Sequence, residues 1–186
     1  MEQNQVGLSV PFLCALLLLL LFDPTGQTEQ ILLAAALHEG GHLLVMARMG
    51  HLPQRMVFGG FGVRIEQRAA MDVGYGKEAL IYAAGPAVNL LCALLLQRRP
   101  DLQRIHLTMG LFNLLPLGCL DGGQLLRCIL RQKVDFVRGT QLQKVLSAFL
   151  SAAVLLFGIV YAKQSPSLLV TGLYLLWNLL WGAGEF

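Results

Sequence analysis

The chain has 186 residues, of which 55% are hydrophobic and 13% are charged, and its mean hydropathy is +0.61. This balance excludes an ordinary soluble domain, in which about 25% of the residues are charged. We therefore interpret the chain as one integral-membrane domain over residues 1–186. The net charge of +3 is small and gives no reason to expect a nucleic-acid partner.

Six apolar runs predict six transmembrane helices. They cover residues 6–22, 31–46, 79–96, 105–120, 145–162 and 168–181. Several are shorter than the ~20 residues that a helix perpendicular to the membrane needs, and the last is the weakest because it is short. The first is easily mistaken for a signal peptide, but no Lys or Arg precedes it, so we interpret it as a retained helix.

The most informative residues are His38, Glu39 and His42, which lie inside the second run. Two histidines four residues apart share one face of a helix, so both imidazoles can reach a single metal ion. Glu39 is offset by about 100° from His38, which suits a carboxylate that takes a proton from water. Ionisable groups are costly inside a bilayer, so this pattern favours a function. The alternative is a histidine pair satisfied by neighbouring helices.

The end of the fourth run carries the candidate third ligand, Asp121. Pro116 and Gly118 should break the helix, and irregular backbone at membrane depth must be buried in protein or face water. With six spans, the second and fourth helices run in the same direction, which places Asp121 on the same side of the membrane as His42. The alternative is that Asp121 caps the helix that follows it.

The third run contains glycine, proline and an amide at positions 85–89. Glycine permits close approach of another helix, and proline frees a backbone carbonyl. Asn89 places its amide within the membrane, where an interhelical hydrogen bond would explain it. His51 and His106 lie near the ends of runs, where a partly solvated imidazole is ordinary. The four cysteines have no CxxC spacing and are interpreted as small core residues.

A short membrane-associated β-hairpin is expected between the second and third helices. Its apolar residues are Val57, Phe58, Phe61, Val63 and Ile65, around a pair of glycines. An exposed strand edge there would pair with an extended peptide, and the alternative is a plain hairpin at the membrane surface. The predicted fold class is thus an all-α membrane protein of six transmembrane helices with this hairpin.

Basic residues predict the orientation of the chain. In the six-span arrangement most Lys and Arg residues lie in the loops within 48–77 and 127–144, on the same side as the N-terminus. Loops rich in Lys and Arg stay in the cytoplasm. We therefore expect both termini, and the side of the membrane that carries the site, to be cytoplasmic.

Three motifs together resemble the site-2 protease family of intramembrane zinc metalloproteases. They are His38-Glu39-Gly40-Gly41-His42, Gly85-Pro86-x-x-Asn89 and Asn113-x-x-Pro116-x-x-x-x-Asp121-Gly122. The resemblance covers about residues 31–130. The layout is most similar to the stage IV sporulation protein FB branch, whose members release a membrane-tethered precursor of a transcription factor during sporulation.

The resemblance implies roles for individual residues. The two histidines and Asp121 would bind Zn²⁺, Glu39 would activate water, and Asn113 and Asn89 would lie near the substrate or the oxyanion. The expected function is an endopeptidase that cleaves a transmembrane or membrane-associated protein, with the substrate and the lipid bilayer as partners and an inhibitory membrane partner left open. The alternatives are a non-catalytic zinc-binding scaffold or regulator and, third, a small transporter.

Overall fold

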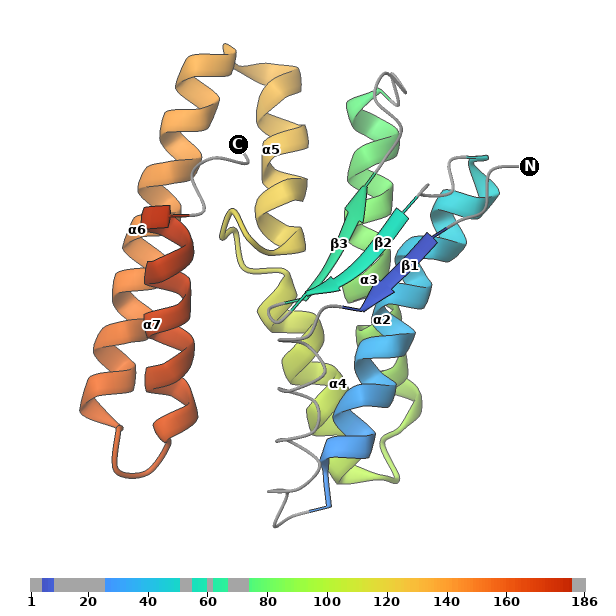
Figure 1. Ribbon diagram of the computed structural model, residues 1–186, viewed down its shortest axis with the longest axis vertical. Helices are drawn as coiled ribbons and strands as arrows, with labels where there is room; N and C mark the ends of the chain where they lie inside the picture. The colour runs from blue at the N-terminus through green and yellow to red at the C-terminus, as the bar shows by residue number, and fades with distance from the viewer. Residues whose placement is uncertain (1–4, 9–25, 51–54, 60–61, 67–73, 182–186) are drawn as a thin grey trace.

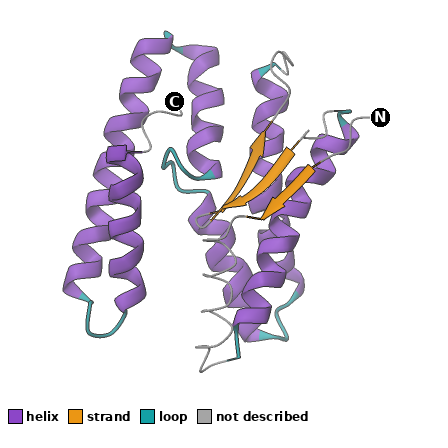
Figure 2. Cartoon of the chain, viewed as in Figure 1, coloured by secondary structure: helices purple, strands orange, loops and turns teal. Residues whose placement is uncertain are grey.

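The computed structural model describes residues 5–8, 26–50, 55–59, 62–66 and 74–181, and this part of the chain forms six helices and one small sheet (Figures 1 and 2). The strands are β1 (Gln5–Leu8), β2 (Arg55–Gly59) and β3 (Gly62–Glu66). The helices are α2 (Thr28–Arg48), α3 (Tyr75–Leu95), α4 (Pro100–Asn113), α5 (Asp121–Lys133), α6 (Phe136–Val160) and α7 (Pro166–Trp181).

Three of the described helices, α2, α3 and α6, are long and apolar enough to cross a membrane. They correspond to the second, third and fifth predicted runs. Their outer faces expose large apolar side chains, among them Leu44, Leu94 and Phe149, as a surface in contact with lipid should. The chain is thus an integral membrane protein. Helix α7 is apolar but has only 16 residues, and the count of six spans stays a prediction.

The first predicted helix is wrong at its beginning. Residues Gln5–Leu8 form strand β1, and residues 9–25 lie outside the described residues. Hydropathy cannot separate the two structures here, because Val6 and Leu8 are apolar in either. Their alternation with Gln5 and Gly7 matches the two-residue period of a strand, and glycine is a poor helix former.

The sheet has the order β1-β2-β3, and β2 and β3 lie in the segment for which the sequence predicts a hairpin. Strands β2 and β3 pair antiparallel, with Arg55 opposite Glu66 and Gly59 opposite Gly62. Strand β1 joins the other side of β2 in parallel, with Gln5 opposite Arg55. Phe61, part of the expected hairpin, lies outside the described residues. Because β2 is paired on both sides, β1 and β3 are the edges of the described sheet.

Helices α2, α3 and α4 pack together, α5 packs against α3, and α6 and α7 form an antiparallel pair that meets the rest through α5 (Figure 1). Gly41 brings α2 close to α3: a Cβ atom at this position would lie 2.9 Å from the Ala84 carbonyl oxygen and 2.9 Å from Val88 Cγ2. At the end of α2, Gly50 adopts φ +73° and its N–H bonds to the Ala47 carbonyl. This left-handed residue stops the helix.

The fourth apolar run is not one helix. Helix α4 spans Pro100–Asn113, and a loop over residues 114–120 separates it from α5, so the break predicted from Pro116 and Gly118 is confirmed (Figure 2). Side chains from other helices bind the polar backbone atoms of this loop. Ser147 Oγ of α6 accepts from the Gly118 N–H at 3.2 Å and donates to the Pro116 carbonyl at 3.4 Å, and Gln124 Nε2 donates to the Gly118 carbonyl at 2.8 Å.

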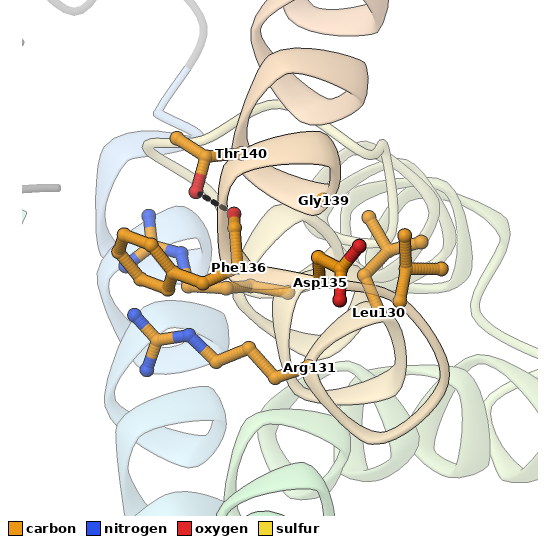
Figure 3. A pocket seen from close by; sticks show the side chains of 8 residues that line it. Leu130, Arg131, Asp135, Phe136, Gly139 and Thr140 are labelled. Atoms are coloured by element: carbon orange, nitrogen blue, oxygen red, sulfur yellow. Dashed lines mark hydrogen bonds between the residues drawn. The ribbon is translucent and has the colours of Figure 1, made fainter.

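Side chains at the junction of α5 and α6 line a small pocket (Figure 3). The Arg131 guanidinium lies 5.3 Å from the centre of the Phe136 ring and 5.8 Å from that of Tyr75 on α3, within the range of cation–π attraction. Thr140 Oγ1 donates to the Phe136 carbonyl at 2.8 Å in the first turn of α6. One cation thereby links α5, α6 and α3.

Two glycines set the position of the first turn of α5. A Cβ atom at Gly122 would collide with the Leu114 carbonyl, and one at Gly123 would collide with the Leu117 carbonyl. The turn therefore lies directly against the 114–120 loop, and Gln143 Nε2 of α6 secures it by donating to the Gly123 carbonyl at 2.8 Å.

Replacing Gly123→Ala should lower the free energy of unfolding by about 1–3 kcal/mol, because the added methyl overpacks a backbone contact that cannot move aside. Denaturant unfolding of the full chain in detergent measures this change. Gly76→Ala in α3 is the matched control, since a Cβ atom there meets nothing within 4 Å and alanine favours a helix. Equal midpoints for Gly123→Ala and wild type would show that the contact is dispensable.

Candidate metal centre

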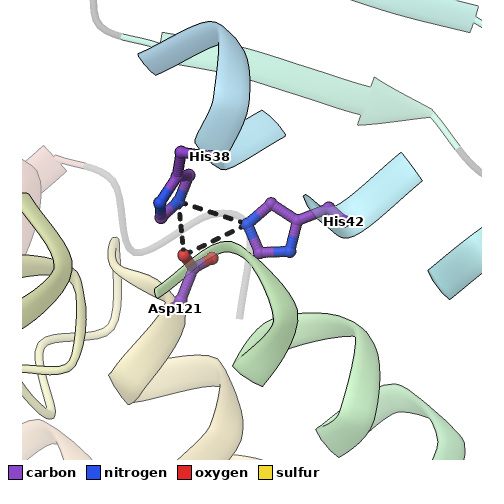
Figure 4. A group of neighbouring side chains, drawn as sticks. All are labelled: His38, His42 and Asp121. Carbon is purple, nitrogen blue, oxygen red and sulfur yellow. Dashed lines mark hydrogen bonds and ion pairs between the residues drawn. The ribbon is translucent and has the colours of Figure 1, made fainter. Parts of the chain in front are cut away.

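Three side chains meet where α2 faces the beginning of α5 (Figure 4). His38 and His42 are each 5% exposed and lie on one face of α2, as their spacing predicts. Asp121 is the first residue of α5. Its Oδ2 atom lies 2.9 Å from His38 Nε2 and 3.2 Å from His42 Nε2, and the two Nε2 atoms lie 3.2 Å apart.

Asp121 does not cap α5. The N-cap position is Leu120, which makes no side-chain cap hydrogen bond, and the Asp121 carboxylate points at the two imidazoles instead. The capping alternative is therefore wrong. The turn of chain before α5 is held by the loop contacts described above, which leaves the carboxylate free to face α2.

The donor set fits a zinc ion. Two imidazoles and one carboxylate are common zinc ligands, and ligands about 2.0–2.1 Å from a tetrahedral ion lie about 3.3 Å apart, close to the separations found here. His42 Nδ1 lies 2.7 Å from the Ile81 carbonyl oxygen. A carbonyl only accepts, so His42 carries its proton on Nδ1 and keeps the lone pair of Nε2 directed at the cluster.

Gly85 on α3 leaves the space that this cluster needs. A Cβ atom at this position would lie 2.7 Å from His38 Nε2 and would collide with His42 Nε2. Any side chain at position 85 would therefore occupy the volume onto which the ligand atoms converge. Glycine has no Cβ atom, so only glycine at position 85 leaves this volume open beside the ligand atoms.

The other predicted site residues lie at different distances from the cluster. Glu39 is half-buried beside His38 and interacts electrostatically with both histidines and Asp121. Asn89 is fully buried, and its amide bonds to His38 Nδ1 at 3.0 Å and to His106 Nδ1 at 3.1 Å. The interhelical bond expected of Asn89 is thus confirmed. Asn113 Nδ2 donates to the Met109 carbonyl within α4, so a role for Asn113 at the substrate stays a prediction.

Comparison with known proteins shows a similarity to a curated relative and to a solved structure. No protein-family model matches the chain. A curated zinc metalloprotease of Methanocaldococcus jannaschii is 26% identical over 69% of this chain, and the match spans only 41% of that relative's length. The solved site-2 protease of the same organism superposes with a TM-score of 0.68 at 21% identity, covering 94% of this chain and 89% of the other. The chain shares the site-2 protease fold.

In this site-2 protease fold the candidate ligands come from two helices, with His38 and Asp121 separated by 83 positions in sequence, and α3 supplies the surrounding contacts. Ile81, Gly85 and Asn89 stand four residues apart on α3 and so form one face directed at the site. Helix α3 therefore lines the site, although it contributes none of the three candidate ligands.

Some residues around the site were not predicted. The assignment of His106 as partly solvated is wrong, since it is 2% exposed and bonded to Asn89. Gln143 and Ser147 were not singled out, yet both bind backbone near Asp121. A signal for them exists in the sequence: Gln143, Ser147 and Ser151 follow one another at four-residue spacing along one face of an apolar helix.

Replacing Gly85→Ala should abolish binding of a divalent metal, because the methyl group would stand where the two Nε2 atoms converge. Zinc content of the purified full chain, measured by mass spectrometry, tests this. Gly40→Ala is the control within the histidine motif, since a Cβ atom there meets nothing within 4 Å, and this variant should bind as wild type does. Full zinc occupancy in Gly85→Ala would contradict the geometry.

Proposed function

We propose that this chain is a zinc metalloendopeptidase of the site-2 protease family that cleaves a transmembrane or membrane-associated protein. The observation that carries the proposal is the convergence of His38, His42 and Asp121, whose ligand atoms all lie within 4.8 Å of one another. The similarity to a zinc metalloprotease and the shared site-2 protease fold support it. The residues of the motif, their order in the sequence and their geometry all agree with peptide hydrolysis at a zinc ion.

The roles of the side chains follow from their chemistry. His38, His42 and Asp121 would hold Zn²⁺, and a zinc ion with three protein ligands acidifies water and polarises a carbonyl group. Glu39 would accept a proton from the attacking water and deliver it to the leaving nitrogen of the peptide bond. Glu39 is half-buried, follows His38 directly on α2 and interacts electrostatically with both imidazoles, which supports this role. Asn113 would donate to the oxyanion, as the family resemblance implies.

The substrate must be extended before it is cut, because the carbonyl groups of a helix are bonded and shielded. Strand addition at a sheet edge holds a peptide in this form. Since β2 is paired on both sides, the edge that continues the expected hairpin is β3, Gly62–Glu66. We propose β3 as the strand that receives the substrate.

The sporulation branch, a membrane-tethered transcription-factor precursor as substrate, an inhibitory membrane partner, and cytoplasmic placement of both termini remain proposals from the sequence. They concern the pathway and the sidedness of the chain, whereas the chemistry above depends only on the residues of the site.

Replacing Glu39→Gln should lower the rate of cleavage about 10²–10⁴-fold while zinc stays bound, because the amide cannot accept the proton from water. Purified chain reconstituted in liposomes with a membrane-protein reporter, together with zinc content, measures both effects. Glu29→Gln is the control, since Glu29 is an exposed carboxylate in the first turn of the same helix.

Undiminished cleavage by Glu39→Gln would rule out this role for the carboxylate. If wild type retains the reporter without cutting it, and the Gln variant retains it equally, the chain is a zinc-binding scaffold instead. If wild type cleaves the reporter and Glu39→Gln does not, comparing the N-termini of membrane proteins in cells that carry either chain would identify the substrate.

A further inference from the structure

The two candidate zinc-binding histidines differ in what holds the nitrogen that faces away from the site. A histidine that binds a metal through Nε2 must carry its proton on Nδ1. His42 meets this requirement through the Ile81 carbonyl, at 2.7 Å, which can only accept. His38 Nδ1 instead lies 3.0 Å from Asn89 Nδ2, the nitrogen of a side-chain amide. An amide presents an acceptor or a donor depending on which way it is turned.

The two orientations of the Asn89 amide have opposite consequences for His38. With Nδ2 toward His38, the amide donates to Nδ1, and the proton of the neutral ring stands on Nε2, from which it bonds to Asp121 at 2.9 Å. With Oδ1 toward His38, the amide accepts from Nδ1–H, and the lone pair of Nε2 is free for a metal. The two orientations have nearly the same shape, so the partner at the far end of the amide decides between them.

That partner is His106 on α4, whose Nδ1 lies 3.1 Å from Asn89 Oδ1 in the structure. His106 is 2% exposed and Asn89 is fully buried, so each polar atom of the amide needs a protein partner. When Oδ1 turns toward His38, Nδ2 turns toward His106, and a His106 ring that carries its proton on Nε2 accepts the amide hydrogen at Nδ1. Without an acceptor at position 106, the amide N–H has only His38 Nδ1 to bond, and that bond keeps the proton on the ligating nitrogen.

We infer that Asn89 and His106 are positioning residues that set the tautomer of His38 for zinc. The inference rests on the proposed function in taking zinc as the ligand of the site. The chain His38–Asn89–His106 crosses from α2 through α3 to α4, so the packing of these three helices and the readiness of the site are linked. Neither Asn89 nor His106 touches the substrate or the reacting atoms in this role.

The test measures the zinc affinity of the full chain in detergent by competition with a chelating dye, with thermal unfolding of the metal-free protein as a check on folding. Asn89→Leu should weaken zinc binding about 10–100-fold, the range found for groups that orient metal ligands. Asn89→Asp should bind at least as tightly as wild type, because a carboxylate accepts from His38 Nδ1–H in either orientation.

The decisive comparison is His106→Phe in two backgrounds. In the wild-type background it should weaken zinc binding about tenfold, since the amide loses its acceptor. In the Asn89→Asp background it should change the affinity little, because a carboxylate has no orientation to select and no N–H to satisfy. A purely structural role for His106 would weaken binding in both backgrounds equally, and this result, or no weakening in either, would overturn the inference.

Failure of this inference is distinguishable from failure of the proposed function. Wild type that binds zinc while His106→Phe binds equally well overturns the inference alone. Wild type that binds zinc but cleaves no substrate overturns the proposed endopeptidase and leaves the tautomer relation supported by its own affinities. If Asn89→Leu does not fold, the zinc affinities of His106→Phe in the wild-type and Asn89→Asp backgrounds test the inference.

Discussion

The site depends on an irregular stretch of backbone whose N–H and carbonyl groups must form hydrogen bonds with side chains of the helices. The loop over residues 114–120 interrupts an apolar run, and within a membrane its exposed N–H and carbonyl groups have no water to bond. Ser147 and Gln124 bind these groups, and Gln143 binds the first turn of the helix that follows. Asp121 comes directly after this loop. Its carboxylate reaches the imidazoles because side chains of α5 and α6 hold the backbone on either side of it.

Close backbone contact is the second requirement, and glycine meets it from three directions. Gly41 lets α2 approach α3, Gly85 leaves room for the imidazole nitrogens, and Gly123 lets α5 rest on the loop. Helix association in lipid gains little from the hydrophobic effect, so small residues that allow dense packing carry much of it. In this chain the same small residues also determine the volume of the site, so the packing of the helices and the geometry of the ligands have a common origin.

Local spacing was enough to predict the central elements of the site. The cluster in the structure was predicted from two histidines one helical turn apart and an aspartate that follows an apolar run broken by proline. What could not be predicted depends on contacts between distant segments. Strand β1 pairs with a strand some fifty positions later, and no window of hydropathy contains both. His106 was judged by its place near the end of a run, whereas its burial follows from the packing of α4 against α3. Helix α4 begins at Pro100, before the run does, because a polar first turn can be helical without being apolar.

The bond between His42 and the Ile81 carbonyl bears on how such a site can change over generations. A main-chain oxygen is present whatever amino acid occupies position 81, so no single substitution at that position deletes this acceptor. The support of His38 is made of side chains and is open to replacement. Substitution therefore cannot remove the support of His42, whereas it can change the support of His38. Differences in metal affinity among chains of this architecture should trace to the side chains that support His38.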